Sequence, residues 1–290
     1  MLHLIDTNDF SDKEIAQILH DAKSFKNQYP PQLLHNKLII TLFFEASTRT
    51  RSSFEVAAKR LGASVVHLDP SRSSTKKGET LDDTFANLCA MEPDGVIIRH
   101  SHNDTPSQLA SMELTPVINA GAGDFAHPTQ ALLDLFTIVE HFNGDIEGKK
   151  VAIVGDILNS RVASSDIRLF TRMGLDVSLV APDEFMPKTE LPSYSSIDDI
   201  IDDVDVIISL RTQLERHKNS DGEYEEYAHY CITKDVMKDR DILLMHPGPV
   251  IRNVDISDEM LEDSRCKVLT QVTNGVFVRM AILKLLLLDN

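Results

Sequence analysis

Short apolar runs of strand character alternate with helical patterns along almost the whole chain, and this alternation constrains the fold more than any other feature. The runs are rich in β-branched and aromatic residues. They cover residues 37–45, 64–68, 95–99, 116–119, 150–154, 176–180, 205–209 and 241–245. Strands that alternate with helices are typical of α/β proteins with mostly parallel sheets. We therefore predict an α/β fold.

Helical periodicity fills the intervals between these runs. In the first helical pattern, apolar residues recur at helical spacing, and Ser11 with Glu14 forms a capping box at its start. The predicted helices run over residues 11–26, from about 48 to 61, and over 128–142, 164–173, 196–201 and 274–288. The last segment is apolar enough to be a packed helix, and its length suits a return across a domain junction.

A turn signal divides the chain into two stretches of similar length. Asn143-Gly144-Asp145 favours a turn, and the strand-helix alternation restarts after it. The chain has 290 residues, about twice the length of a typical single domain. We predict two α/β domains of similar size, residues 1–142 and 143–274, each with a mostly parallel sheet flanked by helices. The C-terminal helix, residues 275–290, is expected to pack back onto the first domain at the junction.

The charge balance excludes several classes of partner. Lys and Arg number 29 against 45 Asp and Glu, which gives a net charge of −16. Nucleic acids and anionic membranes need a basic face, so neither is an expected partner. The chain starts without a basic region followed by an apolar stretch, and no run approaches 18 apolar residues. We expect a soluble, cytoplasmic protein in which any anionic ligand meets a local cluster of cations.

Cysteines and acidic clusters point to structural roles. Cys89, Cys231 and Cys266 are odd in number and lack C-x-x-C spacing, so they predict small buried residues rather than disulfides or a zinc site. Acidic clusters at 198–205 and 223–226 could bind metal or form solvated helix faces. Neither contains a calcium-loop pattern with a distal Glu, so we predict solvated faces and no metal.

The most informative stretch is Ser47-Thr48-Arg49-Thr50-Arg51, placed where a strand ends and a helix begins. Free backbone N–H groups and the positive end of the helix dipole meet at such a position and bind anions. The hydroxyls and a guanidinium add hydrogen bonds suited to phosphate. The same residues would also fit a capped helix with two surface arginines. The stretch is neither a P-loop nor a G-x-G-x-x-G motif.

Several long motifs, in the same order along the chain, resemble those of the aspartate/ornithine carbamoyltransferase family. The first two are S-T-R-T-R at 47–51, followed by Phe54-Glu55, and H-P-T-Q-A-L-L-D at 127–134. Further segments resemble the aspartate-specific members: 73–80, 96–100, 155–163, 210–216 and H-P-G-P-V at 246–250. The resemblance runs from about residue 3 to the C-terminus. His-Pro-Gly-Pro in place of His-Cys-Leu-Pro distinguishes this chain from the ornithine type.

The resemblance implies a phosphate site in the first domain. Ser47, Thr48 and Thr50 would hold the phosphate of carbamoyl phosphate through hydroxyls and backbone. Arg49 would bridge the phosphate and the leaving oxygen, and Arg99 would supply a second guanidinium.

The resemblance also assigns the carbamoyl group to the start of a later helix. His127 would donate a hydrogen bond to the carbamoyl oxygen, and Gln130, three residues on, would position the carbamoyl NH2. The family usually has Ala-Gly-Asp-Gly before this motif. Here Ala122 replaces the aspartate, and Asp124 lies two residues later. The family pattern therefore does not predict how the residues around His127 pack.

For the second substrate, the resemblance places arginines in the second domain. Arg161 would bind the α-carboxylate of aspartate and Arg211 its side-chain carboxylate, with Gln213 holding Arg211 and the substrate. Gly248 and Pro249 would complete this substrate site. Arg161 and Arg211 each follow a predicted strand, where ligands of α/β sheets bind. Each arginine by itself would equally fit a solvated surface.

A polar segment at residues 71–79 suggests a shared active site. Its composition predicts a mobile loop with no apolar anchor. In the family this loop enters the active site of a neighbouring subunit. There the lysine, here Lys77, contacts both substrates, while a serine, here Ser73 or Ser74, contacts the phosphate. The resemblance therefore implies a homotrimer with shared sites, in which Lys77 joins Arg49, Thr50, Arg99 and His127 in catalysis.

The activity implied is transfer of the carbamoyl group from carbamoyl phosphate to the amine of L-aspartate, in pyrimidine synthesis. No cofactor or metal is required, because the nucleophile is the substrate amine. A transferase for ornithine or a related amine is the alternative, and it would need an acidic residue in place of Arg211. A dehydrogenase is disfavoured because the run around Gly155 lacks the other fingerprint glycines, and a binding-only paralogue because every contact residue is present. Association with a regulatory subunit or a dihydroorotase stays open.

Overall fold

A computed structural model describes residues 1–68, 79–211 and 230–288. The chain forms two compact units. Unit 1 comprises Met1–Leu133 with Val272–Asn290, and unit 2 comprises Asp134–Gln271. The division falls within α5 (Pro128–His141) and within the first turn of α9 (Val268–Leu287), whereas the turn signal places the domain boundary at the end of α5.

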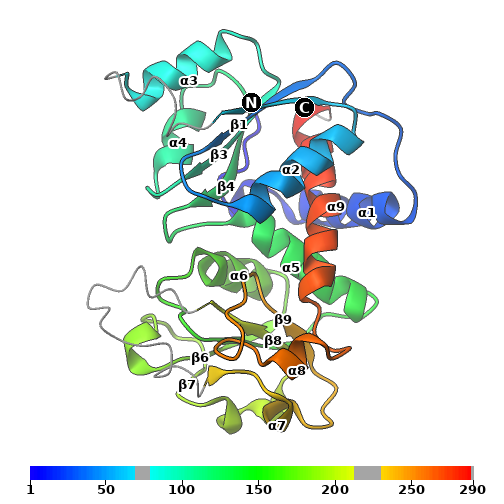
Figure 1. The fold of residues 1–290 in the computed structure, drawn as a ribbon, viewed down its shortest axis with the longest axis vertical. Helices are drawn as coiled ribbons and strands as arrows, with labels where there is room; N and C mark the ends of the chain where they lie inside the picture. Colours follow the sequence, from blue (N-terminus) through cyan, green and yellow to red (C-terminus); the bar gives the residue numbers. More distant parts are fainter. Residues whose placement is uncertain (69–78, 212–229, 289–290) are drawn as a thin grey trace. The chain divides into compact units, whose positions relative to one another are not determined.

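Unit 1 is built on a parallel sheet, as the strand-helix alternation predicts (Figure 1). Its strands are β1 (Leu38–Phe43), β2 (Ser64–Leu68), β3 (Gly95–His100) and β4 (Val117–Ala122). Their order is β2-β1-β3-β4, and all neighbours run parallel. The carboxyl ends of β1, β3 and β4 therefore lie beside one another along one edge of the sheet.

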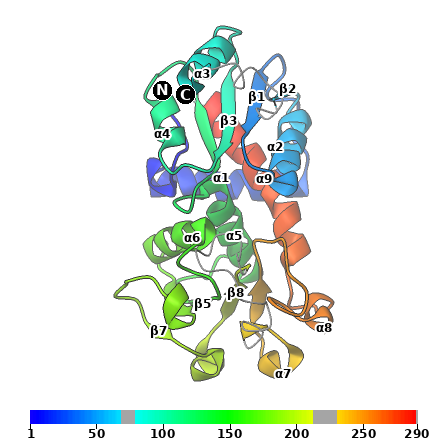
Figure 2. The same ribbon diagram turned by 60° about the vertical axis from the view of Figure 1, so that its left-hand side comes forward.

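Helices cover both faces of this sheet. Residues of β1 and β3 such as Leu42 and Ile98 pack on Phe85 and Leu109 on one face, while α2 and α9 lie on the other (Figures 1 and 2). The helical elements of unit 1 are η1 (Thr7–Asp9), α1 (Asp12–Asn27), α2 (Thr48–Arg60), α3 (Leu81–Cys89), α4 (Thr105–Ala110) and α9 (Val268–Leu287). The predicted capping box is confirmed: the Ser11 N–H donates to the Glu14 carboxylate at 2.7 Å, and the Glu14 N–H to the Ser11 hydroxyl at 3.3 Å.

The C-terminal helix α9 returns to unit 1, as predicted, although it begins six residues before the predicted start at 274. Lys26 Nζ donates to Asn274 Oδ1 at 2.8 Å, and Lys284 Nζ to Asp21 Oδ2 at 2.8 Å. By length and composition α9 could cross a membrane, but 61% of its most apolar window is buried within the fold. Such burial is typical of a core helix in a packed protein.

Unit 2 contains a second parallel sheet. Its strands are β5 (Lys150–Val154), β6 (Asp176–Val180), β7 (Ser193–Tyr194), β8 (Val206–Ser209) and β9 (Leu243–Met245), in the order β7-β6-β5-β8-β9. In Figure 1, α6 lies on one side of this sheet and α7 and α8 lie on the other. The helical elements are α6 (Arg161–Arg172), η4 (Asp183–Phe185), η5 (Ile197–Asp199), η6 (Ile201–Asp203), α7 (Lys234–Met237) and α8 (Asp258–Leu261).

One predicted helix is wrong. Residues 196–201 form parts of two short 3-10 helices, η5 and η6, instead of an α-helix. The buried residues Ile197, Ile200 and Ile201 account for the helical pattern. An α-helix would also place aspartates four residues apart, at 198 and 202 and at 199 and 203, and like charges at this spacing are destabilising. The tighter turns bury the same apolar residues.

Candidate active site

The start of α2 presents the serine-threonine-arginine motif directly after β1. Ser47 is the N-cap residue, yet its side chain makes no capping hydrogen bond. Thr48 and Arg49 are exposed, and Thr50 is buried in the first turn. The backbone N–H groups of this turn and the helix dipole favour an anion here. The missing side-chain cap argues against the alternative in which Ser47 serves only to cap the helix.

The two arginines of the motif differ in environment. Arg51 Nη1 lies 2.9 Å from His67 Nε2, and its Nε lies 3.6 Å from Glu55 Oε1. His67 is held in turn by Thr41, whose Oγ1 lies 2.9 Å from Nδ1. Arg51 is therefore directed back toward the sheet, and Arg49 is the exposed arginine of the motif.

Arg99 lies at the carboxyl end of β3, next to the residues that lead into α2. It is in register with Phe43 of β1, and its carbonyl accepts from the Phe44 N–H at 2.9 Å. Its side chain donates to the Ala120 carbonyl at 3.3 Å, and Nε lies 3.3 Å from a Glu45 carboxylate oxygen. This ion pair holds the guanidinium, only 13% exposed, at the same sheet edge as the α2 start.

A tight turn connects β4 to α5. The N–H of Ala122 donates to the Ala126 carbonyl at 2.9 Å, and Gly123 has a φ of +45°, which favours glycine. Asn103 holds the turn: its amide donates to Asp124 at 2.8 Å and its oxygen accepts from the Asp124 N–H at 3.1 Å. Buried Ala122 and the displaced Asp124 thus form a closed turn before His127.

His127 and Gln130 begin α5. His127 immediately precedes the first helical residue, and its carbonyl accepts from the Gln130 N–H at 2.9 Å. Both side chains are largely buried, at 4% and 8% exposure. Because β1, β3 and β4 are neighbours, unit 1 brings the α2 start, Arg99, His127 and Gln130 to one edge of its sheet.

A residue that the motifs do not identify connects α2 with α5. Arg279 of α9 is 3% exposed and donates to Ser53 Oγ at 2.9 Å and to Thr129 Oγ1 at 3.2 Å. Its guanidinium lies 5.0 Å from the centre of the Phe54 ring. A Cβ on Gly275 would come within 2.6 Å of Arg279 Nη1, so glycine leaves room for the guanidinium. A charged residue in an apolar helix was the available signal.

In unit 2 the residues predicted to bind the aspartate substrate follow three neighbouring strands, β5, β8 and β9. Arg161 is the first residue of α6 and is 7% exposed, and Ser160 caps the helix by accepting from the Ala163 N–H at 3.2 Å. Arg211 follows the end of β8 and is half-buried. The two guanidinium-bearing residues therefore begin from adjacent strand ends, where ligands of parallel sheets bind.

Gly248 and Pro249 lie in the loop after β9. Gly248 has a φ of +68°, in the left-handed region that favours glycine, and Pro249 is exposed. The Gly248 N–H donates to His246 Nδ1 at 2.7 Å, and His246 Nε2 lies 3.1 Å from Asp255 Oδ2. The loop therefore lies at the same edge of the sheet as the segments that carry Arg161 and Arg211.

Other predicted residues lie outside the described residues. They are Lys77 with Ser73 and Ser74, in 69–78, and Gln213, in 212–229.

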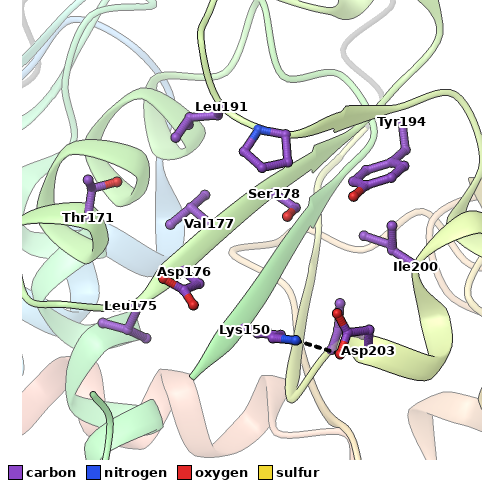
Figure 3. Close-up of a pocket in the computed structure, with 12 residues that line it drawn as sticks. Lys150, Thr171, Leu175, Asp176, Val177, Ser178, Leu191, Tyr194, Ile200 and Asp203 are labelled. Atoms are coloured by element: carbon purple, nitrogen blue, oxygen red, sulfur yellow. Dashed lines mark hydrogen bonds and ion pairs between the residues drawn. The ribbon is translucent and has the colours of Figure 1, made fainter. Parts of the chain in front are cut away.

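A cavity of about 380 Å³ lies elsewhere in unit 2 (Figure 3). The first residues of β5 and β6, Lys150 and Asp176, line it, so it is at the opposite end of the strands from Arg161. Lys150 pairs with Asp203 at its margin. The cavity contains none of the predicted site residues.

Cys231 is buried as predicted, whereas Cys89 and Cys266 are only partly buried. Burial raises the pKa of the Cys89 and Cys231 thiols to about 11, which keeps them protonated and unreactive at neutral pH. Within the acidic cluster at 198–205, Asp202 contacts Arg240 at 2.6 Å and Asp205 contacts Lys149 at 3.5 Å. These ion pairs match the expected surface role of the cluster.

Comparisons with known proteins cover both units. The model of the aspartate/ornithine carbamoyltransferase carbamoyl-P binding domain matches residues 2–140, and that of the Asp/Orn binding domain matches residues 147–286. An aspartate carbamoyltransferase catalytic subunit from Sulfurovum sp. is 72% identical over 292 residues, covering 100% of this chain and 99% of its own.

Two solved structures are similar along nearly the whole chain. The catalytic subunit of M. jannaschii aspartate transcarbamoylase is 34% identical with a TM-score of 0.90, covering 100% of this chain and 99% of its own. Aspartate transcarbamoylase from Trypanosoma cruzi, in complex with carbamoyl phosphate and aspartate, is 31% identical with a TM-score of 0.88, covering 97% and 95%. Together with the two domain models and the arrangement of both sheet edges, these similarities show that the chain belongs to the aspartate/ornithine carbamoyltransferase family.

Proposed function

We propose that this protein transfers the carbamoyl group from carbamoyl phosphate to the amine of L-aspartate. The products are N-carbamoyl-L-aspartate and phosphate, in an early step of pyrimidine synthesis. The observation that carries the choice of aspartate is the pair of arginines, Arg161 and Arg211, which follow the neighbouring strands β5 and β8. Two guanidinium groups suit a dicarboxylate, whereas ornithine would need an acidic partner for its ammonium group. The 72% identical catalytic subunit supports the same choice.

Unit 1 supplies the groups for carbamoyl phosphate. The first turn of α2, with Ser47, Thr48 and Thr50, provides hydroxyls and N–H donors for the phosphate. Arg49 is exposed beside them and stabilises the charge that develops on the leaving oxygen. Arg99 adds a second guanidinium from the neighbouring strand.

The carbamoyl group is placed at the start of α5. His127 donates to the carbamoyl oxygen and stabilises the oxyanion of the tetrahedral intermediate, while Gln130 orients the NH2. The substrate amine attacks the carbonyl carbon, the C–O bond to phosphate breaks, and the departing phosphate takes up the amine proton. Orientation and electrostatic stabilisation supply the rate enhancement, so the substrate amine needs no activating cofactor.

Substrate preference tests this function. Purified protein should carbamoylate aspartate and leave ornithine unreacted when both are assayed with carbamoyl phosphate. A phosphonoacetyl-aspartate mimic carries a phosphonate together with both carboxylates of aspartate, and we expect it to bind at least about 100-fold more tightly than phosphate or aspartate. Turnover of ornithine at a comparable rate would contradict the choice of aspartate, and affinity no better than that of phosphate would contradict the two-pocket assignment.

We further propose that active sites are shared between subunits of a homotrimer, with Lys77 supplied by a neighbour. The basis is the resemblance of the 71–79 segment to the family loop. Lys77→Ala and His127→Ala are each expected to be inactive, and mixing them should restore activity. A cyclic trimer assembled at random from equal parts has about one intact site in four. No recovery after subunit exchange, confirmed by mass, would place Lys77 in its own chain's site.

A cytoplasmic location is part of the proposal. It is supported by three cysteines without a disulfide spacing, which suit a reducing compartment. Cell fractionation of the tagged protein tests it, and recovery with the membrane or secreted fraction would contradict it.

A further inference from the structure

Two buried side chains, His246 and Asp255, lie behind the loop that contains Gly248 and Pro249. Their side chains are 0% and 1% exposed, so solvent does not reach either. We propose that His246 and Asp255 are positioning residues that hold the Gly248–Pro249 loop in the conformation that receives the aspartate substrate. The inference rests on the proposed function, because it assigns this loop to the aspartate site.

Hydrogen-bond chemistry determines the tautomer of His246. The Gly248 N–H lies 2.7 Å from His246 Nδ1, and a backbone N–H can only donate, so Nδ1 carries no proton. The ring hydrogen is then on Nε2, which donates to Asp255 Oδ2 at 3.1 Å. Asp255 thereby selects the only neutral tautomer that can bind the Gly248 amide.

Asp255 also holds the far side of the loop. The same oxygen, Oδ2, accepts from the Ile251 N–H at 2.7 Å. The loop is therefore fixed before Pro249 through His246 and after Val250 directly by the carboxylate. Gly248 can take its left-handed φ of +68° without steric cost, and the two anchored amides define the short segment between them.

His246 is also held by helices α9 and α5, and Asp255 is held by strand β8. The His246 N–H donates to Gln271 Oε1 at 2.9 Å, and Gln271 Nε2 donates to Asp134 Oδ1 at 2.7 Å. The Asp255 carbonyl accepts from Ser209 Oγ at 3.1 Å. Ser209 is the last residue of β8, two positions before Arg211. The pair thus connects the loop after β9 to the strand that presents Arg211.

Two isosteric substitutions separate the two bonds of the ring. In His246→Asn the amide oxygen can occupy the position of Nδ1 and accept from Gly248. In His246→Gln the amide nitrogen can occupy the position of Nε2 and donate to Asp255, but the acceptor for Gly248 is lost. We expect His246→Gln to raise the KM for aspartate about tenfold and His246→Asn to raise it less than about threefold. The affinity for carbamoyl phosphate, measured by titration, should stay within about twofold in both.

A second readout does not depend on activity. Amide hydrogen exchange at Gly248 should accelerate in His246→Gln and remain slow in His246→Asn. Asp255→Asn keeps an oxygen that can accept both hydrogen bonds and should retain a KM near that of the wild type, whereas Asp255→Ala should not.

The outcomes distinguish failure of the positioning role from failure of the proposed function. Equal increases in KM for both His246 variants, or no increase in either, would overturn the positioning role. A wild-type protein that does not carbamoylate aspartate would overturn the proposed function instead, and exchange at Gly248 would still test the loop contact.

Discussion

The predicted site residues of the two units are grouped differently along the chain. Those of unit 1 lie mainly at the starts of two long helices, with Ser47, Thr48 and Thr50 at the start of α2 and Gln130 in α5, while Arg99 lies at the end of β3. Those of unit 2 follow three separate strands: Arg161 begins α6 after β5, Arg211 follows β8, and Gly248 and Pro249 follow β9. A phosphate can be bound by the N–H groups of one helical turn, whereas two carboxylates some distance apart need separate guanidinium groups.

The contacts that support the predicted site residues also differ between the two units. In unit 1 a single buried arginine, Arg279, bridges the two helices through hydroxyl groups. In unit 2 a buried polar chain through Asp134, Gln271 and His246 supports the loop beside the arginines. The phosphate half should therefore be sensitive to packing around one helix, and the aspartate half to buried titratable groups.

The largest expected effect is the loss of Arg49. Arg49→Ala should lower kcat by about 1,000-fold, because this guanidinium is assigned to the charge on the leaving oxygen. Steady-state kinetics at saturating substrates measure the effect. Arg51→Ala is the matched control: its guanidinium already contacts His67 at 2.9 Å, so we expect less than about threefold change. Similar losses in both variants would remove the distinction between the two arginines.

The second prediction addresses unit 2 alone. Arg211→Ala should raise the KM for aspartate about 100-fold, because a carboxylate loses its guanidinium partner, and should also lower kcat. The affinity for carbamoyl phosphate should stay within about threefold. Arg172→Ala removes the same charge from the exposed end of α6 and should leave both constants unchanged. Equal loss of affinity for both substrates would indicate a folding defect and break the division of labour between the units.

A third prediction tests the packing of unit 1. Gly275→Ala would place Cβ 2.6 Å from Arg279 Nη1 and 3.0 Å from Leu133 Cδ2, so it should lower the free energy of unfolding by about 1–3 kcal/mol. Urea denaturation measures the change. Val272→Ala, an exposed position of the same helix, should change the stability by less than about 0.5 kcal/mol. An unchanged midpoint for Gly275→Ala would show that Arg279 can move without cost.

The smallest effect concerns a buried acid of unit 2. Asp166 is fully buried, and desolvation, with the nearby Asp134 carboxylate as a smaller cause, raises its pKa well above the usual value. The unfolded chain releases this proton near pH 4, while the folded chain retains it to higher pH, so stability falls as the pH rises through this interval. Asp166→Asn should therefore stabilise the protein by about 1 kcal/mol at pH 7.

The pH dependence of that variant checks the sign. Below about pH 4 Asp166 is protonated in both the folded and the unfolded wild-type protein. The difference in unfolding free energy between the wild type and Asp166→Asn should therefore decrease there. Stability curves at several pH values measure it. A destabilised variant at pH 7 would mean that Asp166 is charged in the folded protein.

Much of the fold could be predicted because its signals are local. The strands at 64–68, 150–154 and 176–180 are confirmed to the residue, since runs of β-branched residues bounded by turns predict strands even where, as in β2, the strand is only partly buried. The four-residue helices α7 and α8 are too short to produce a periodic pattern. The segment at 196–201 carries the right apolar spacing, but repulsion between its aspartates is not visible in that spacing.

The predicted site residues also depend on local sequence signals. Ser47 and Thr50 could be selected because strand, turn and helix start are adjacent in sequence. Arg279 could not, because its partners Ser53 and Thr129 lie 226 and 150 residues away. Likewise, nothing in the His-Pro-Gly-Pro motif indicates that a buried Asp255 sets the tautomer of its histidine.

The composition of unit 1 from two distant segments has a consequence for biosynthesis. The ribosome makes Val272–Leu287 only after all of unit 2 has been translated. Until α9 emerges, Ser53 and Thr129 have no Arg279 to bridge them, and the sheet face that α9 covers is open. Unit 1 therefore stays incomplete while unit 2 is synthesised. During this time the apolar sheet face of unit 1 is exposed, and such a surface is one that chaperones bind.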